Sequence, residues 1–159
     1  MGTIRIALAA IVFAVLAISP ATAQVVAVTG KCKTTDSAFT VVTSPEAEIL
    51  NQQFQNVPGA SVSFTQAVRG CVIVLFSAES FAGVGESLML RPILPGAGAS
   101  SPATLMFAAN DPNLYTTRSA VFVFQNVAAG AHTLRMQARS AGGTQTELRG
   151  YTLVVQFRG

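Results

Sequence analysis

The chain has 159 residues, of which 11% are charged, and its ten basic and seven acidic side chains leave a net charge of +3. Nucleic-acid binding normally requires a dense basic stripe, so this small excess argues against DNA or RNA as a partner. Half of the residues are hydrophobic, and the many Val, Phe, Thr, Ser and Gly residues are typical of a compact β protein.

The first residues read as an export signal. Arg5 precedes an apolar run of 13 residues that ends at Ile18, and Ala21-Thr22-Ala23 supplies an A-x-A cleavage site. The alternative, a retained membrane anchor, would need about 20 apolar residues. We therefore predict a secretory signal peptide over residues 1–23. Residues 24–159 are expected to form one domain, secreted or periplasmic, with no transmembrane segment after cleavage.

Two cysteines, Cys32 and Cys71, remain after this signal. Export places them in an oxidising compartment, where we expect them to form a disulfide. A closed loop of about 40 residues would stabilise the fold by about 4 kcal/mol in the chain-entropy model. The alternative, a redox or metal pair, lacks the C-x-x-C spacing and the nearby histidine that such sites use.

The first half of the chain reads as short β-strands with one ambiguous stretch. Residues 44–48 have the serine cap, proline and acids that begin a helix, and residues 49–56 either continue it or are extended. We favour an extended segment, because the surrounding strands are short and closely spaced. The expected elements are strands over Val25–Lys33, Phe39–Thr43, Val62–Gln66 and Cys71–Ser77, with turns at Thr34–Ser37, Pro58-Gly59 and Arg69-Gly70.

Glycine and proline divide the middle of the chain into further short elements. Pro92 falls inside one predicted strand and indicates a sheet edge or a bulge. The expected elements are a loop at Gly83 and Gly85, a strand over Glu86–Leu94, a surface loop over Pro95–Pro102, a strand over Thr104–Ala108 and a tight turn over Asn110–Asn113.

The C-terminal stretch, residues 118–158, has the clearest pattern. An apolar run over 120–124 suits a strand covered on both faces, and residues 132–139 and 151–158 alternate with the period of two that a pleated strand imposes. Roughly eight to ten strands at spacings of about 8 to 15 residues, with little helix, predict an all-β fold. We expect an antiparallel two-sheet β-sandwich, jelly-roll or immunoglobulin-like in topology.

His132 is the only histidine, so any histidine-based mechanism would depend on it. A general base needs an orienting partner and a nucleophile, and no serine lies in a G-x-S-x-G elbow. We therefore interpret His132 as a residue at the start of a strand whose ring bonds backbone groups of the preceding loop.

Glu79 and Glu86 could act in glycoside hydrolysis only if their carboxyl groups met across the intervening glycine loop. We favour the alternative that they are loop acids bonded to turn amides or to an arginine. Residues 110–113 offer oxygen atoms to calcium, but their spacing matches no calcium loop and is also that of a turn. We predict no catalytic residue, no metal site and no cofactor.

Arginines supply the most specific binding hypothesis. Arg135 and Arg139 share the polar face of one predicted strand, and Arg158 lies on the polar face of another. Together they could form a basic patch for an acidic polysaccharide, for lipid head groups or for the carboxylates of a partner protein. The alternative is an ordinary solvated sheet face.

Some segments of the chain are similar to known sequences. They are Cys71-Val72-Ile73-Val74, Phe76-Ser77-Ala78-Glu79, Gly130 to Gln137, Arg139-Ser140 and Gly142-Gly143. With these segments the chain resembles a group of small secreted bacterial β-sandwich proteins of uncharacterised function. The resemblance covers Ala60 to Phe157 and implies the fold and export, but no activity and no functional residue. The segment from Val127 to Gln137 is also similar to strands of carbohydrate-binding modules, although this chain lacks their tryptophan platform.

These observations predict an exported, non-enzymatic β-sandwich protein with a structural or interaction role at the cell envelope or outside the cell. Its partner would be an envelope polysaccharide or a protein, and a homo-oligomer is compatible with the sequence. The alternative is a carbohydrate- or other ligand-binding module that uses Arg135 and Arg139 or the loops around Gly83 and Gly96. A hydrolase is the least favoured class.

Overall fold

The computed structural model describes residues 32–43, 47–49, 51–142 and 146–159, without the side chains of residues 47, 48 and 111–113. The predicted signal peptide over residues 1–23 and nearly all of the strand expected over 25–33 lie outside this range. The helix-start signature at 44–48, which we weighed against an extended segment, lies outside it as well, apart from residues 47 and 48. None of the described residues belongs to a helix that is long and apolar enough to cross a membrane.

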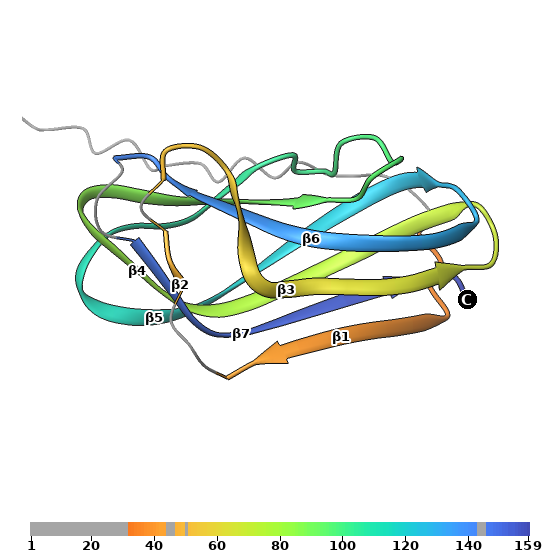
Figure 1. Ribbon diagram of the computed structural model, residues 1–159, viewed down its shortest axis with the longest axis horizontal. Coiled ribbons are helices and arrows are strands. Elements are labelled where there is room, and N and C mark those ends of the chain that lie inside the picture. Colours follow the sequence, from red (N-terminus) through yellow and green to blue (C-terminus); the bar gives the residue numbers. More distant parts are fainter. Residues whose placement is uncertain (1–31, 44–46, 50, 143–145) are drawn as a thin grey trace, which may run out of the picture.

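Seven β-strands account for most of the described chain (Figure 1). All the strand pairs are antiparallel. The strands are β1 (Asp36–Val42), β2 (Ala47–Glu48), β3 (Gln55–Gln66), β4 (Gly70–Ile93), β5 (Leu105–Val127), β6 (Gly130–Ser140) and β7 (Thr146–Phe157).

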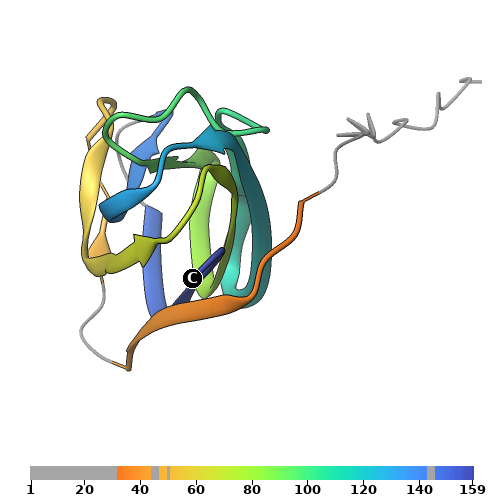
Figure 2. The same cartoon turned by 90° about the vertical axis from the view of Figure 1, so that its right-hand side faces the viewer.

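Strand β4 connects the whole sheet. Its first part, residues 73–82, pairs with β7, and its last part, residues 88–93, pairs with β6. Strand β5 pairs with both parts of β4, along the edge of β4 opposite to β7 and β6. The strand order is β1-β7-β4-β6-β3, and β5 pairs with β4 and β2 with β7. The sheet therefore bends along β4 and β5 and wraps around one core, as the end view in Figure 2 shows.

The all-β, antiparallel part of the predicted fold is confirmed. The finer assignment to two separate sheets is not, because the described strands form one continuous hydrogen-bonded sheet that nearly closes on itself. The extended reading of the stretch that follows residue 46 is also supported, since residues 47 and 48 form β2 and no described residue is helical.

Two of the loops and turns that were predicted to separate strands are wrong, because these residues lie inside long strands. The glycine loop near Gly85 lies within β4, and the turn expected over 110–113 lies within β5. The pairing register shifts between Ala82 and Ser87, which marks an irregularity of the bulge type. Gly85 and Asn110 have positive φ angles of 76° and 49°, and the Gly85 amide donates to Asn110 Oδ1 at 2.8 Å.

A third predicted break, the turn at Pro58-Gly59, lies within β3. The register between β3 and β6 shifts between Asn56 and Ser61, so the turn residues form a bulge there. Gly59 has a φ of +73°, a backbone conformation that side chains disfavour, and a Cβ there would lie 3.1 Å from Val42 Cγ2 of β1. Strand β3 thus passes close to β1.

One hydrophobic core fills the bent sheet. Strands β6 and β7 alternate as predicted, so that Leu134, Met136 and Ala138 are fully buried, while Arg135 is exposed. Phe76 lies at the centre, with ring centroids 5.8 Å from both Phe107 and Tyr151. Other fully buried large side chains are Phe122, Phe124, Leu88, Leu90, Leu148 and Leu153.

Tyr151 links the two edges of the sheet across the seam between β1 and β3. It pairs with Val42 of β1, and its hydroxyl donates a hydrogen bond to the carbonyl oxygen of Pro58 in β3. Burial raises the pKa of the Tyr151 phenol above its ordinary value. The phenol is therefore held in its neutral, donating form.

We expect Tyr151→Phe to lower the free energy of unfolding at neutral pH by about 1–2 kcal/mol, because the Pro58 carbonyl loses its donor. The raised pKa of Tyr151 also makes the stability of the fold depend on pH. The folded state favours the neutral phenol, and this contribution to the free energy of unfolding is complete below the ordinary tyrosine pKa of about 10. It is lost as the pH rises through the pKa of the folded state. Urea denaturation between pH 7 and pH 11 should therefore show a smaller alkaline loss for Tyr151→Phe than for the wild type. Equal alkaline losses would contradict this role.

Candidate functional site

Arginine side chains gather on the outer face of the sheet formed by β3, β6 and the last part of β4. The alternation of β6 turns Arg135, Gln137 and Arg139 away from the core. The register places Arg91 of β4 beside Gln137. We call Arg91, Arg135, Gln137, Arg139 and Phe54, which precedes β3, the arginine face.

Phe54 contacts two guanidinium groups of this face. The Cζ atom of Arg91 is 4.1 Å from the centroid of the Phe54 ring, and that of Arg139 is 5.3 Å away. Both distances are within the range of cation–π attraction. The ring therefore holds two positive charges near each other on the sheet surface.

Hydrogen bonds fix the orientation of Arg91. Its Nε donates to Gln137 Oε1 at 2.9 Å, and Gln137 Nε2 donates to Asn56 Oδ1 at 3.0 Å. Within the described part of the chain, no carboxylate lies within ion-pair distance of Arg91, Arg135 or Arg139. A planar guanidinium that is held in this way is suited to bind carboxylate, sulfate or phosphate with two parallel hydrogen bonds.

A hollow of about 400 Å³ adjoins Arg91. It lies between the end of β4 and the loop that follows it, and it includes the Gly96 loop that the sequence suggested for ligand binding. Among its described lining residues Arg91 is the only charged one, and Ser100 and Thr104 add hydroxyl groups. The hollow and the arginine face therefore have Arg91 in common.

The structure brings together only part of the predicted arginine patch. Arg135 and Arg139 share one face of β6, as expected, but Arg158 follows β7, which is separated from β6 by β4 in the sheet. The Arg158 carbonyl accepts a hydrogen bond from the Ala67 amide at the β3–β4 turn. Sequence reasoning missed Arg91 and Phe54, because alternation assigns a residue to a face but does not identify its neighbours on other strands.

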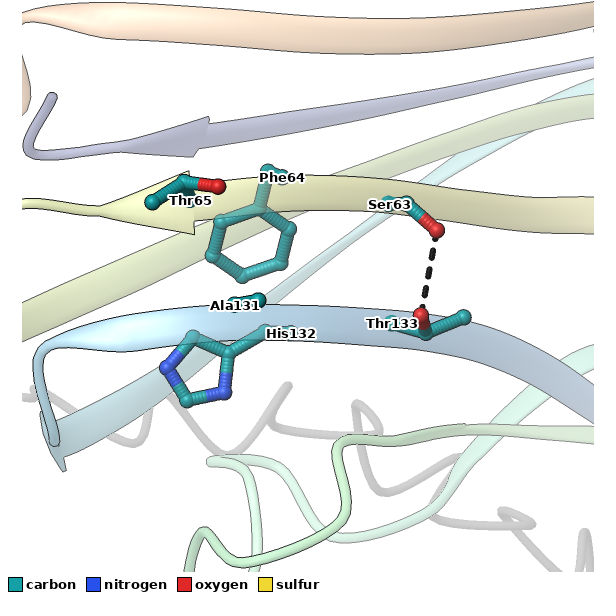
Figure 3. Close-up of a pocket in the computed structure, with 6 residues that line it drawn as sticks. All are labelled: Ser63, Phe64, Thr65, Ala131, His132 and Thr133. Atoms are coloured by element: carbon teal, nitrogen blue, oxygen red, sulfur yellow. Dashed lines mark hydrogen bonds between the residues drawn. The ribbon is translucent and has the colours of Figure 1, made fainter.

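His132 has the structural role predicted for it. Its Nε2 donates to the Ala128 carbonyl at 2.9 Å across the β5–β6 turn, and its ring lies 5.4 Å from that of Phe64. A shallow hollow of about 360 Å³ adjoins it (Figure 3). The other lining residues are Ser63, Thr65, Ala131 and Thr133, and the hydroxyls of Ser63 and Thr133 bond each other at 3.0 Å.

The two candidate acids lie in different environments. Glu86 is 6% exposed, and its Oε2 accepts hydrogen bonds from Ser140 Oγ at 2.7 Å and from the Gly142 amide at 2.9 Å. This confirms the interpretation of Glu86 as an acid that binds a turn amide. Glu79 is exposed on β4, at a position paired with Thr117 and Arg149.

Cys32 and Cys71 form the predicted disulfide, with their Cα atoms 5.5 Å apart. Cys71 lies in β4, and Cys32 precedes β1. Because β7 separates β1 from β4 in the sheet, the disulfide fastens the chain across the end of β7. Among the described residues, no three His, Cys, Asp or Glu side chains are grouped so that they could hold a metal ion.

Comparison with known proteins gives no family. No protein-family model and no curated protein matches the chain. A solved structure described as "Structure of the tripod (BppUct-A-L) from the baseplate of bacteriophage Tuc2009" is similar with a TM-score of 0.42 and 14% sequence identity. The alignment covers 100% of this chain and 82% of that one. A likeness of this size identifies no function, so the function is argued from the residues themselves.

Proposed function

We propose that the protein is exported and non-enzymatic, and that it acts at the cell envelope or outside the cell by binding an anionic polymer through the arginine face. The observation that carries this proposal is the pair of guanidinium groups of Arg91 and Arg139 on Phe54, with Arg135 on the same face. These arginines have no carboxylate partner among the described residues, so their charge is free to meet an external anion.

Two observations support export. The Cys32–Cys71 disulfide is typical of an oxidising compartment, and the sequence of residues 1–23 has the layout of a secretory signal. A binding role without catalysis is supported by the use of His132 and Glu86 in bonds that hold turns. We also propose to group the bent sheet with two-layer β-sandwiches, because β4 and β5 each contribute to both halves of the fold.

Acidic polysaccharides are the ligand class that fits this surface best. A polymer with repeating carboxylate or sulfate groups presents an anion to the guanidinium groups at successive positions, and two oxygens of each such group can accept parallel hydrogen bonds. Neutral sugars would require aromatic platforms, and the chain has no tryptophan. The arginine face therefore favours an anionic over a neutral glycan.

We expect the double variant Arg135→Gln/Arg139→Gln to bind polygalacturonate at least about tenfold more weakly than the wild type, because charge-assisted hydrogen bonds of about 1.5 kcal/mol are lost. Isothermal titration calorimetry at low and at physiological salt measures the effect. The matched control, Arg69→Gln/Arg158→Gln, removes the same charge from exposed positions outside the face and should bind within about twofold of the wild type.

Three results would contradict the proposal. The first is an equal loss of affinity in both double variants. The second is unchanged affinity in Arg135→Gln/Arg139→Gln. The third is that the wild type binds neither polygalacturonate nor the sulfated polymer heparin. Dextran, a neutral glucan, serves as the negative ligand in each titration.

A further inference from the structure

A patch without charged side chains lies on another side of the core, on the outer surface of the sheet. It consists of the outward side chains of residues 37–41 of β1, 152–156 of β7, 73–77 of β4 and 119–123 of β5, and beyond it the same surface carries Glu79 and Arg149. The register places Phe39, Val154, Leu75 and Val121 in one row across the four strands. We call this the uncharged face. Its twelve outward residues are Ser37, Phe39, Val41, Ile73, Leu75, Ser77, Ser119, Val121, Val123, Thr152, Val154 and Gln156.

Apolar side chains on this face are unusually open to solvent. Phe39 is 70% exposed, Val41 54% and Val121 52%. In β4, β5 and β7 the residues between them, such as Phe76 and Phe122, are buried in the core, so the exposed row is a second apolar surface and not a part of the first. Contiguous apolar patches of this kind mark interaction sites in soluble proteins.

We infer that the uncharged face is the contact between two copies of this chain, packed face to face. Two identical surfaces without charge approach each other without electrostatic repulsion, whereas two arginine faces would repel each other. The polar residues of the uncharged face are Ser, Thr and Gln, whose side chains both donate and accept hydrogen bonds. Such side chains can pair with their own copies across a two-fold axis.

The dimensions of the face suit a small dimer interface. The face spans five residues of each strand, about 17 Å, and four strands about 4.8 Å apart are about 19 Å wide. Two copies would together cover about 650 Å² in projection, which is the size of a weak, transient contact and smaller than that of a stable interface. We therefore expect a weak, reversible dimer.

Sedimentation equilibrium of the purified protein at about 1–200 µM tests this inference, because a weak, reversible dimer should dissociate on dilution within this range of concentrations. Val121→Lys places an ammonium group at the centre of the face in both copies, and we expect it to raise the dimer dissociation constant at least about 100-fold. The control is Leu114→Lys, which adds the same charge to the same strand at a residue that is 73% exposed and outside the face. It should dimerise like the wild type.

The proposal is overturned if the wild type is monomeric over this range, or if both variants dissociate equally. Unfolding midpoints of both variants near that of the wild type show that folding is intact. If the wild type is monomeric and binds neutral phosphatidylcholine vesicles, and the Val121→Lys variant does not bind them, the face is assigned to lipid instead. A monomer that dimerises once the residues before Cys32 are removed would assign the face to that segment of the chain.

Discussion

Replacing both cysteines, as in Cys32→Ser/Cys71→Ser, is expected to lower the free energy of unfolding by about 4 kcal/mol. The disulfide spans a sequence separation of 39 residues and restricts the unfolded chain over that length. In the folded state it also fastens the residues before β1 to β4 across the end of β7. Urea denaturation followed by circular dichroism measures the difference.

Reductant provides the control for this prediction. Dithiothreitol should lower the unfolding midpoint of the wild type to that of the double variant and leave the double variant unchanged. A double variant within about 1 kcal/mol of the oxidised wild type would show that the disulfide contributes little, as happens when the unfolded state is already restricted.

Glu86→Ala is expected to destabilise the protein by about 3 kcal/mol. The Glu86 carboxylate accepts hydrogen bonds from the buried Ser140 hydroxyl and from the Gly142 amide, and both donors would lose this acceptor. The Ser140 hydroxyl is fully buried, so that water cannot replace the lost carboxylate there. The same carboxylate fastens the end of β6 to β4, so the end of the sheet would also loosen.

Glu79→Ala is the matched control, since it removes an exposed carboxylate from the same strand and should change the free energy of unfolding by no more than about 0.5 kcal/mol. Thermal and urea denaturation of the two variants at pH 7 measure the contrast. Equal effects would show that Glu86 is not the anchor that its hydrogen bonds indicate.

Local patterns in the sequence predicted the strands better than their connections. Alternation identified the buried and exposed sides of β6 and β7, and the apolar run at Cys71–Ser77 identified the centre of the sheet. The breaks at Gly85 and Pro58-Gly59 were wrong, because a bulge absorbs residues that otherwise form turns. Whether a glycine ends a strand or bends it depends on the partner strand, which the local sequence does not reveal.

The candidate site depends even more on distant pairing. Arg91 and Gln137 are 46 residues apart, and Phe54 reaches both Arg91 and Arg139 only because β3 and β4 flank β6. The sequence identified Arg135 and Arg139 as sharing a face, since that follows from one strand alone. It also included Arg158, whose strand lies beyond β4.

Strand β4 carries parts of both surfaces, with Leu75 in the uncharged face and Arg91 in the arginine face. The two surfaces therefore belong to one strand, on either side of the irregularity between Ala82 and Ser87. A pair of copies joined through their uncharged faces would display two arginine faces on a single body. Such a body would grip a long anionic strand at two points or tie two strands together, so that avidity would multiply a modest single-site affinity.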